Sequence, residues 1–196
     1  MNRKPIIVLC EGNSEYAYVQ CLNGLMHEID APCTFAPKNV GFGSFRQMKS
    51  AHGKERKQNP RTRIVALLDH DIYARNERAS HDGYQKFKFR NDFKFNRQNF
   101  EDFLALHLDD EKLRKWEDVC RAQDHFRTPM LAKDYMPLVR AHLFPGYQKG
   151  EIPFELDNAA LQNLFRHNAD PTVPFKSDFA AFLLEENIFS RDFFNS

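Results

Sequence analysis

Two short apolar segments, each followed by a cluster of acidic residues, constrain the fold of this chain more than any other feature. The segments are residues 6–10 and 64–68. The first runs into Glu11 and Glu15, and the second runs into Asp69 and Asp71. Continuous apolar runs of this length are typical of strands that are buried in a parallel sheet. Because α/β proteins gather ligands at the carboxyl ends of such strands, we expect a ligand site there.

The chemistry of that site follows from its charges. If the two strands are neighbours, Glu11, Glu15, Asp69 and Asp71 share one small volume, where four carboxylates cannot all stay ionised without a cation. A hard divalent ion such as Mg²⁺ or Mn²⁺ prefers oxygen ligands of this kind. Asp69 and Asp71 stand two residues apart, so an extended backbone points both side chains the same way. The hypothesis is a metal-dependent phosphoryl-transfer site.

Strand and helix patterns alternate through the first part of the chain. The expected elements are strands over 5–10, 33–36 and 63–69 and helices over 14–29 and 45–58. This order predicts a parallel sheet with right-handed crossovers. Residues 87–96 alternate phenylalanines with polar and basic residues, which predicts strand, turn and strand, or one bulged strand. The fold class is therefore α/β, a parallel sheet flanked by helices.

The second half of the chain reads as helical. Expected helices begin at Phe100 and then cover residues 110–126, 131–143, 157–168 and 177–188, separated by proline-containing breaks. We expect residues 1–108 to form the α/β domain. Residues 109–196 are expected to be a mostly helical extension that packs on the same domain.

A third motif adds a family resemblance. Residues 99–107 read Asn-Phe-Glu-Asp-Phe-Leu-Ala-Leu-His, and they follow the Glu-Gly-x-x-Glu turn at Glu11 and the Asp-x-Asp turn at Asp69. In order and approximate spacing these three motifs resemble the RloB-like TOPRIM proteins, which are related to OLD-type TOPRIM nucleases. The resemblance covers roughly the first half of the chain. It implies a TOPRIM-like sheet, nuclease activity and a setting in bacterial phage defence.

The resemblance also implies roles for single residues. Glu11 takes the position of a metal ligand or general base, and Asp69 and Asp71 that of metal ligands. Glu15 matches the second glutamate of the turn, and Glu101 could be a further acidic ligand. The expected catalytic set is Glu11, Glu15, Asp69, Asp71 and Glu101, with metal held by Glu11, Asp69 and Asp71.

Other interpretations of these residues stay open. Acidic residues such as Glu15 and Glu101 also stabilise the first turn of a helix without any catalytic role. Arg97-Gln98-Asn99 stands where the family has Ser-Asn-Pro, so the resemblance does not extend to substrate positioning there. Lys149 aligns loosely with a lysine of the relatives. His107 is expected to be a hydrogen-bonded core histidine.

Basic residues flank the acidic motifs in sequence and suit a phosphate-rich partner. The candidate nucleic-acid-binding residues are Arg46, Lys49, Lys54, Arg56, Lys57, Lys88, Lys94 and Arg97. They would contact backbone phosphates, which gives salt-sensitive and weakly sequence-specific binding. The alternative is that these stretches are solvated surfaces without a ligand.

The amino-acid composition limits the classes of protein to which this chain can belong. The chain has 196 residues, 42% of them hydrophobic, and its 19 phenylalanines indicate a packed core more than a base-stacking surface. Its four cysteines form no C-x-x-C pair, which favours free thiols in a reducing compartment. Residues 6–10 are too few for a signal-peptide core or a membrane span. We therefore expect a soluble, cytoplasmic protein.

The leading hypothesis is a Mg²⁺- or Mn²⁺-dependent nuclease that hydrolyses DNA or RNA phosphodiesters with water as the nucleophile. The alternative is a non-catalytic accessory subunit that binds metal or a partner protein of a defence or restriction system. Nucleotidyl transfer is a third interpretation, but the chain has no G-x-x-x-x-G-K-[ST] loop for a nucleoside triphosphate. A homo-oligomer is compatible with each of these.

Overall fold

The protein is described here by a computed structural model. The structure describes residues 4–41, 45–69, 92–97, 99–127, 130, 132–185 and 188–189. The predictions for Asp71, Lys88 and the segment 70–91 lie outside the described residues.

The centre of the fold is a four-stranded parallel sheet with the strand order β2-β1-β3-β4. Its strands are β1 (Lys4–Cys10), β2 (Cys33–Asn39), β3 (Arg63–Asp69) and β4 (Phe93–Asn96). β1 and β3, the two apolar segments of the sequence, are the inner strands, and Cys10 pairs with Leu67 in their register. The predicted α/β fold with a parallel, TOPRIM-like sheet is confirmed. β4 adds a fourth parallel strand, in which Asn96 pairs with Asp69.

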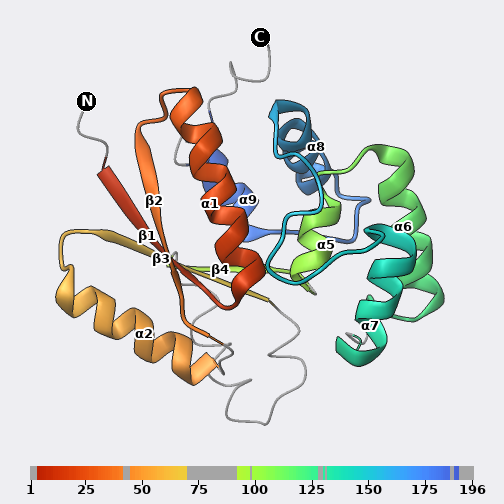
Figure 1. The fold of residues 1–196 in the computed structure, drawn as a ribbon, viewed down its shortest axis with the longest axis horizontal. Helices are drawn as coiled ribbons and strands as arrows, with labels where there is room; N and C mark the ends of the chain where they lie inside the picture. Colours follow the sequence, from red (N-terminus) through yellow and green to blue (C-terminus); the bar gives the residue numbers. More distant parts are fainter. Residues whose placement is uncertain are drawn as a thin grey trace.

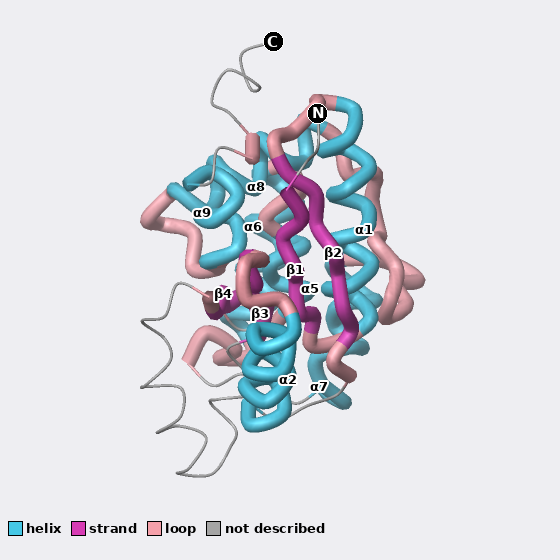
Figure 2. Tube along the Cα trace, turned by 90° about the vertical axis from the view of Figure 1, so that its left-hand side faces the viewer, coloured by secondary structure: helices cyan, strands magenta, loops and turns pink. Residues whose placement is uncertain are grey.

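Helices cover both faces of the sheet (Figures 1 and 2). α1 (Asn13–Glu28) packs Tyr18 and Leu22 on one face, in the same core as Val8. α2 (Phe45–Gln58) packs Phe45 and Met48 on the other face, against the side chains of β1 that point the opposite way. Because successive side chains of a strand alternate between faces, strands as apolar as β1 and β3 need a helix on each side.

The rest of the chain is mostly helical, as predicted. Its helices are α5 (Phe100–Ala105), α6 (Asp110–Ala122), α7 (Ala132–Leu138), the π-helical turn η1 (Val139–Leu143), α8 (Asn158–Ala169) and α9 (Asp178–Glu185). Buried side chains of these helices join the α1 face of the sheet in one continuous core. Most phenylalanines that the structure describes lie in this core, which agrees with the packing role expected from the sequence.

Two further expectations concern the environment of the protein. The four cysteines are free, with Cys10, Cys33 and Cys120 buried and Cys21 exposed. Among the described residues, no helix combines the length and the apolar character that a membrane span requires.

Candidate metal and nucleic-acid site

The carboxyl edge of the sheet brings the two acidic motifs together. Glu11 follows β1, and Asp69 ends the neighbouring strand β3. The backbone N–H of Asp69 donates a hydrogen bond to Glu11 Oε2 over 3.4 Å. The structure therefore places Glu11 beside Asp69, although 58 residues of chain separate them.

Asp69 is held in place by groups from two other elements. Its Oδ1 accepts a hydrogen bond from Asn96 Nδ2 at the end of β4 (3.3 Å). Its Oδ2 accepts the backbone N–H of Phe100, the first residue of α5 (2.8 Å). Since two N–H donors bind this carboxylate, its orientation is fixed by the end of β4 and the start of α5.

A second pair of acids, Glu15 and Glu101, is buried. Their exposed fractions are only 6% and 4%. Glu15 Oε2 accepts the backbone N–H of Gly12 (3.1 Å) at the start of α1. Burial is the main cause that raises the pKa of Glu15 to about 7, and the nearby charge of Glu101 adds to the rise. Burial also raises the pKa of Glu101. The two side chains therefore come from separate motifs to one buried place, and their proton affinity is increased.

The loop after η1 closes over this pair. Ser14 Oγ accepts hydrogen bonds from Gly150 N–H (3.0 Å) and from Tyr147 O–H (3.2 Å). Tyr147 O–H also lies 3.4 Å from Glu101 Oε1. The ammonium of Lys149 lowers the pKa of both Glu15 and Glu101 and so offsets part of the effect of burial. Lys149 is thus the cation that the structure brings to the two buried acids.

A metal ion needs ligand atoms from several side chains close to one another. Among the described residues, the one group of three whose ligand atoms lie within 4.8 Å of one another is Asp102, Cys120 and His125. This buried group could hold a metal ion, but it is not the predicted set. Among the described residues, Glu11 and Asp69 form no such group with a third ligand. Asp71, the third predicted ligand, lies outside the described residues.

The Asp102 group has hydrogen bonds that account for its burial. Asp102 Oδ1 accepts from Trp116 Nε1 and from Tyr135 O–H, each at 2.9 Å. Its Oδ2 lies 2.9 Å from His125 Nε2 and accepts the N–H of Asn99 at 3.1 Å. Because the Nδ1 atom of His125 accepts the N–H of Met130 (3.2 Å), the proton of the neutral ring is on Nε2, which donates to Asp102.

Asp102 therefore anchors α5, the helix that also supplies Glu101 and the N–H bound to Asp69. A carboxylate with four donors has its acceptor sites filled. Burial raises the pKa of the Cys120 thiol, which disfavours the thiolate that a metal would need. Reasoning from the sequence missed this cluster, because Trp116, His125 and Tyr135 lie 14, 23 and 33 residues from Asp102.

His107 is a hydrogen-bonded core histidine, as the sequence predicts. Its Nδ1 lies near the carbonyl oxygens of Leu104 (3.2 Å) and Phe103 (3.3 Å) and donates to them. Its Nε2 therefore accepts the hydroxyl of Tyr18 at 2.8 Å. Burial lowers the pKa of His107 to about 3, so the ring is neutral in the folded protein at ordinary pH.

A loss of stability in acid follows from this neutral ring. The unfolded chain binds a proton at His107 below its ordinary pKa of 6.5, whereas the folded protein does not until about pH 3. Stability is therefore lost as the pH falls through this window. When the pH falls from 7 to 4.5, the free energy of unfolding decreases in both proteins. We expect this decrease to be about 2–3 kcal/mol smaller in His107→Gln than in the wild type. Urea unfolding at both pH values measures this, with exposed His27→Gln as the control. Equal losses in all three proteins would contradict the prediction.

The basic residues divide into several environments. Four of the predicted cations line an open hollow along α2, namely Arg46, Lys49, Lys54 and Lys57. Arg56 forms an ion pair with Asp92 (3.2 Å), and Arg97 is exposed after β4. Lys94 lies in a different environment from the other predicted cations. This side chain is only 9% exposed and lies over the ring of Phe182 at 5.4 Å, because α9 packs against this face of β4.

Comparisons with known proteins do not assign this chain to a family. The chain matches no family model, no curated protein and no solved structure.

Proposed function

We propose that this protein is a metal-dependent nuclease of the RloB-like TOPRIM kind, acting in the cytoplasm in bacterial phage defence. The observation that carries the proposal is the meeting of the two sequence motifs, Glu11 beside Asp69, at the carboxyl edge of a parallel sheet. The second support is the buried pair of Glu15 and Glu101 within the same part of the fold. Such a concentration of carboxylates is suited to a cation and to proton transfer.

The donor set fits Mg²⁺ or Mn²⁺, since it consists of carboxylate oxygens, which hard divalent ions prefer. Glu11, Asp69 and Asp71 would hold the ion. When bound, such an ion neutralises the charge that develops on a phosphodiester during its hydrolysis. Asn96 and the N–H of Phe100 orient the carboxylate of Asp69 for this task.

Proton transfer belongs to the buried acids in this proposal. A group with a pKa close to the working pH is the most effective general base, and that of Glu15 is about 7. Glu15 would accept the proton of the attacking water, and Glu101 would hold charge beside it. Lys149 and the hydroxyl of Tyr147 keep the pair in place under the loop.

The proposal predicts cleavage that depends on a divalent ion. End-labelled DNA and RNA, each single-stranded and duplex, are incubated with the protein in Mg²⁺, in Mn²⁺ and in EDTA. We expect strand cleavage with at least one ion and none in EDTA, because the acids alone cannot neutralise the phosphate. Cleavage that persists unchanged in EDTA would contradict the metal role, and no cleavage under any condition would contradict the enzyme.

A non-catalytic accessory role is the second candidate. One observation favours it, since both oxygens of Asp69 already have hydrogen-bond donors within the protein. An accessory subunit would bind the ion or nucleic acid without cleaving it. Retarded migration of the same labelled strands in a native gel, without any cleavage, would support this candidate.

A further inference from the structure

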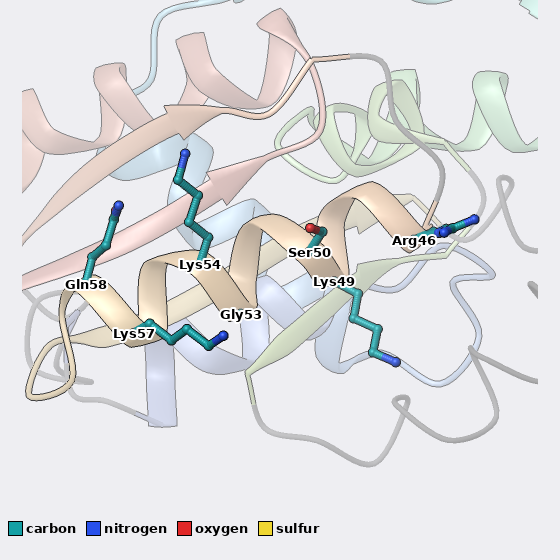
Figure 3. A pocket seen from close by; sticks show the side chains of 7 residues that line it. All are labelled: Arg46, Lys49, Ser50, Gly53, Lys54, Lys57 and Gln58. Carbon is teal, nitrogen blue, oxygen red and sulfur yellow. The ribbon is translucent and has the colours of Figure 1, made fainter.

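α2 carries an open, basic hollow whose lining has a regular pattern. The hollow measures about 620 Å³, and its described lining residues are Arg46, Lys49, Ser50, Gly53, Lys54, Lys57 and Gln58. Counted from Arg46, they stand at positions i, i+3, i+4, i+7, i+8, i+11 and i+12, a spacing that spreads them over one broad face of the helix. Figure 3 shows Lys54 and Gln58 pointing to one side of α2 and Lys49 pointing to the other. The two smallest residues, Ser50 and Gly53, occupy the stretch of helix between these long side chains.

Packing does not explain why residue 53, inside helix α2, is a glycine. A glycine in the interior of a helix destabilises the helix relative to alanine, because its backbone is more flexible when unfolded. A Cβ atom built on Gly53 would meet nothing within 4 Å, so no neighbour excludes a larger side chain. The glycine leaves this part of the lining of the hollow without a side chain.

Two described carboxylates near α2 are paired with cations that do not line the hollow. Glu55, on α2 itself, binds Lys38 at 2.7 Å, and Asp92 binds Arg56 at 3.2 Å. None of the described residues that line the hollow is acidic. The described lining therefore carries four cations and no acid, which suits an anion that extends along the helix.

The direction of α2 links the hollow to the acidic edge. β2 ends at the carboxyl edge of the sheet and α2 begins soon after it, whereas β3 starts from the opposite edge directly after α2. Arg46 therefore lies at the end of α2 nearest Glu11 and Asp69, and Lys57 lies at the far end. At 1.5 Å per residue, the cations span roughly 16 Å along the helix.

We infer that the hollow on α2 is the seat of one nucleic-acid strand, with its phosphates between Lys49, Lys54 and Lys57 and its backbone lying close over Gly53. This inference rests on the proposed function, since it names the surface that leads the substrate to the acidic edge. An extended polyanion fits a row of cations along one helix face, and the missing side chain at Gly53 permits close approach. Such binding depends on phosphates, so it is sensitive to salt and tolerant of base sequence.

Gly53→Leu tests the inference, with Gly24→Leu as the matched control. Gly24 also lies inside a helix, α1, and a Cβ atom there would likewise meet nothing within 4 Å. Both substitutions replace glycine by a strong helix former, so both should raise the melting temperature. Binding is measured by fluorescence anisotropy with labelled single-stranded DNA and RNA in EDTA, where metal-dependent cleavage does not proceed.

We expect Gly53→Leu to weaken oligonucleotide binding at least tenfold, while Gly24→Leu binds like the wild type. Lys57→Ala should reduce the slope of log affinity against log salt by about 0.7. Wild-type affinity in Gly53→Leu would overturn the inference. The inference would also be overturned if the wild type bound anionic phosphatidylserine vesicles but bound neither oligonucleotide. The binding assay needs no catalysis. If a strand binds at the hollow but the protein never cleaves it, this inference holds and only the proposed nuclease activity is contradicted.

Discussion

Asp102→Asn is expected to lower the free energy of unfolding by about 4 kcal/mol or more, a large part of the stability of an ordinary domain. The carboxylate is fully buried and accepts from Trp116, Tyr135, His125 and the N–H of Asn99. An amide has one acceptor oxygen, and its own N–H groups would face donors. Each buried donor left without an acceptor costs about 1–3 kcal/mol.

Urea unfolding followed by tryptophan fluorescence measures this effect directly. Trp116 is the only tryptophan of the chain, and its indole contacts Asp102. Asp118→Asn is the matched control on α6, because Asp118 is exposed and forms a 3.5 Å ion pair with Arg121. The control should change stability by less than about 1 kcal/mol. A loss below 1 kcal/mol in Asp102→Asn would show that the network is not a main support of α5.

Glu11→Gln is expected to reduce metal-dependent cleavage by at least about 100-fold while leaving the fold intact. The amide oxygen of glutamine can still accept the N–H of Asp69, but the variant lacks the negative charge that a cation requires. Asp69→Asn is a less suitable probe. Two N–H donors, from Asn96 and Phe100, bind separate oxygens of Asp69, and an amide offers only one.

The control for Glu11→Gln is Glu28→Gln, the same exchange at the exposed, opposite end of α1. Single-turnover cleavage rates in Mn²⁺ and thermal melting curves are recorded for all three proteins. Glu28→Gln should cleave like the wild type, and both variants should melt close to it. Wild-type cleavage by Glu11→Gln would remove this glutamate from the site, and a large fall in its melting temperature would make its role structural.

Much of the fold could be predicted from local patterns. The apolar runs of β1 and β3, and the helical spacing of Tyr18 and Leu22 in α1, depend on near neighbours in the chain and on burial of one face or two. The alternation around Phe93 and Phe95 also predicted a strand. The environment of Lys94 could not be predicted, because alternation separates two faces of a strand without showing which of them a later helix covers.

The candidate site could also be predicted only in part from the sequence. Its acids were identifiable because each follows a strand or begins a helix, where the carboxyl ends of parallel strands gather polar groups. Glu15 and Glu101 were singled out, but their burial, which is the main cause of their raised pKa values, could not be predicted. The groups around them come from distant segments: Tyr147, which lies 3.4 Å from Glu101, is 46 residues away along the chain.

The amino-acid sequence alone determined the class of fold, the strand ends that carry Glu11 and Asp69, and the basic character of α2. These properties are local, since they follow from the period of apolar residues and from the types of residue at each turn. Only the tertiary structure decided that Asp102 anchors α5 and that Lys94 is buried. Both depend on contacts between segments far apart in the chain, and no local pattern encodes such distances.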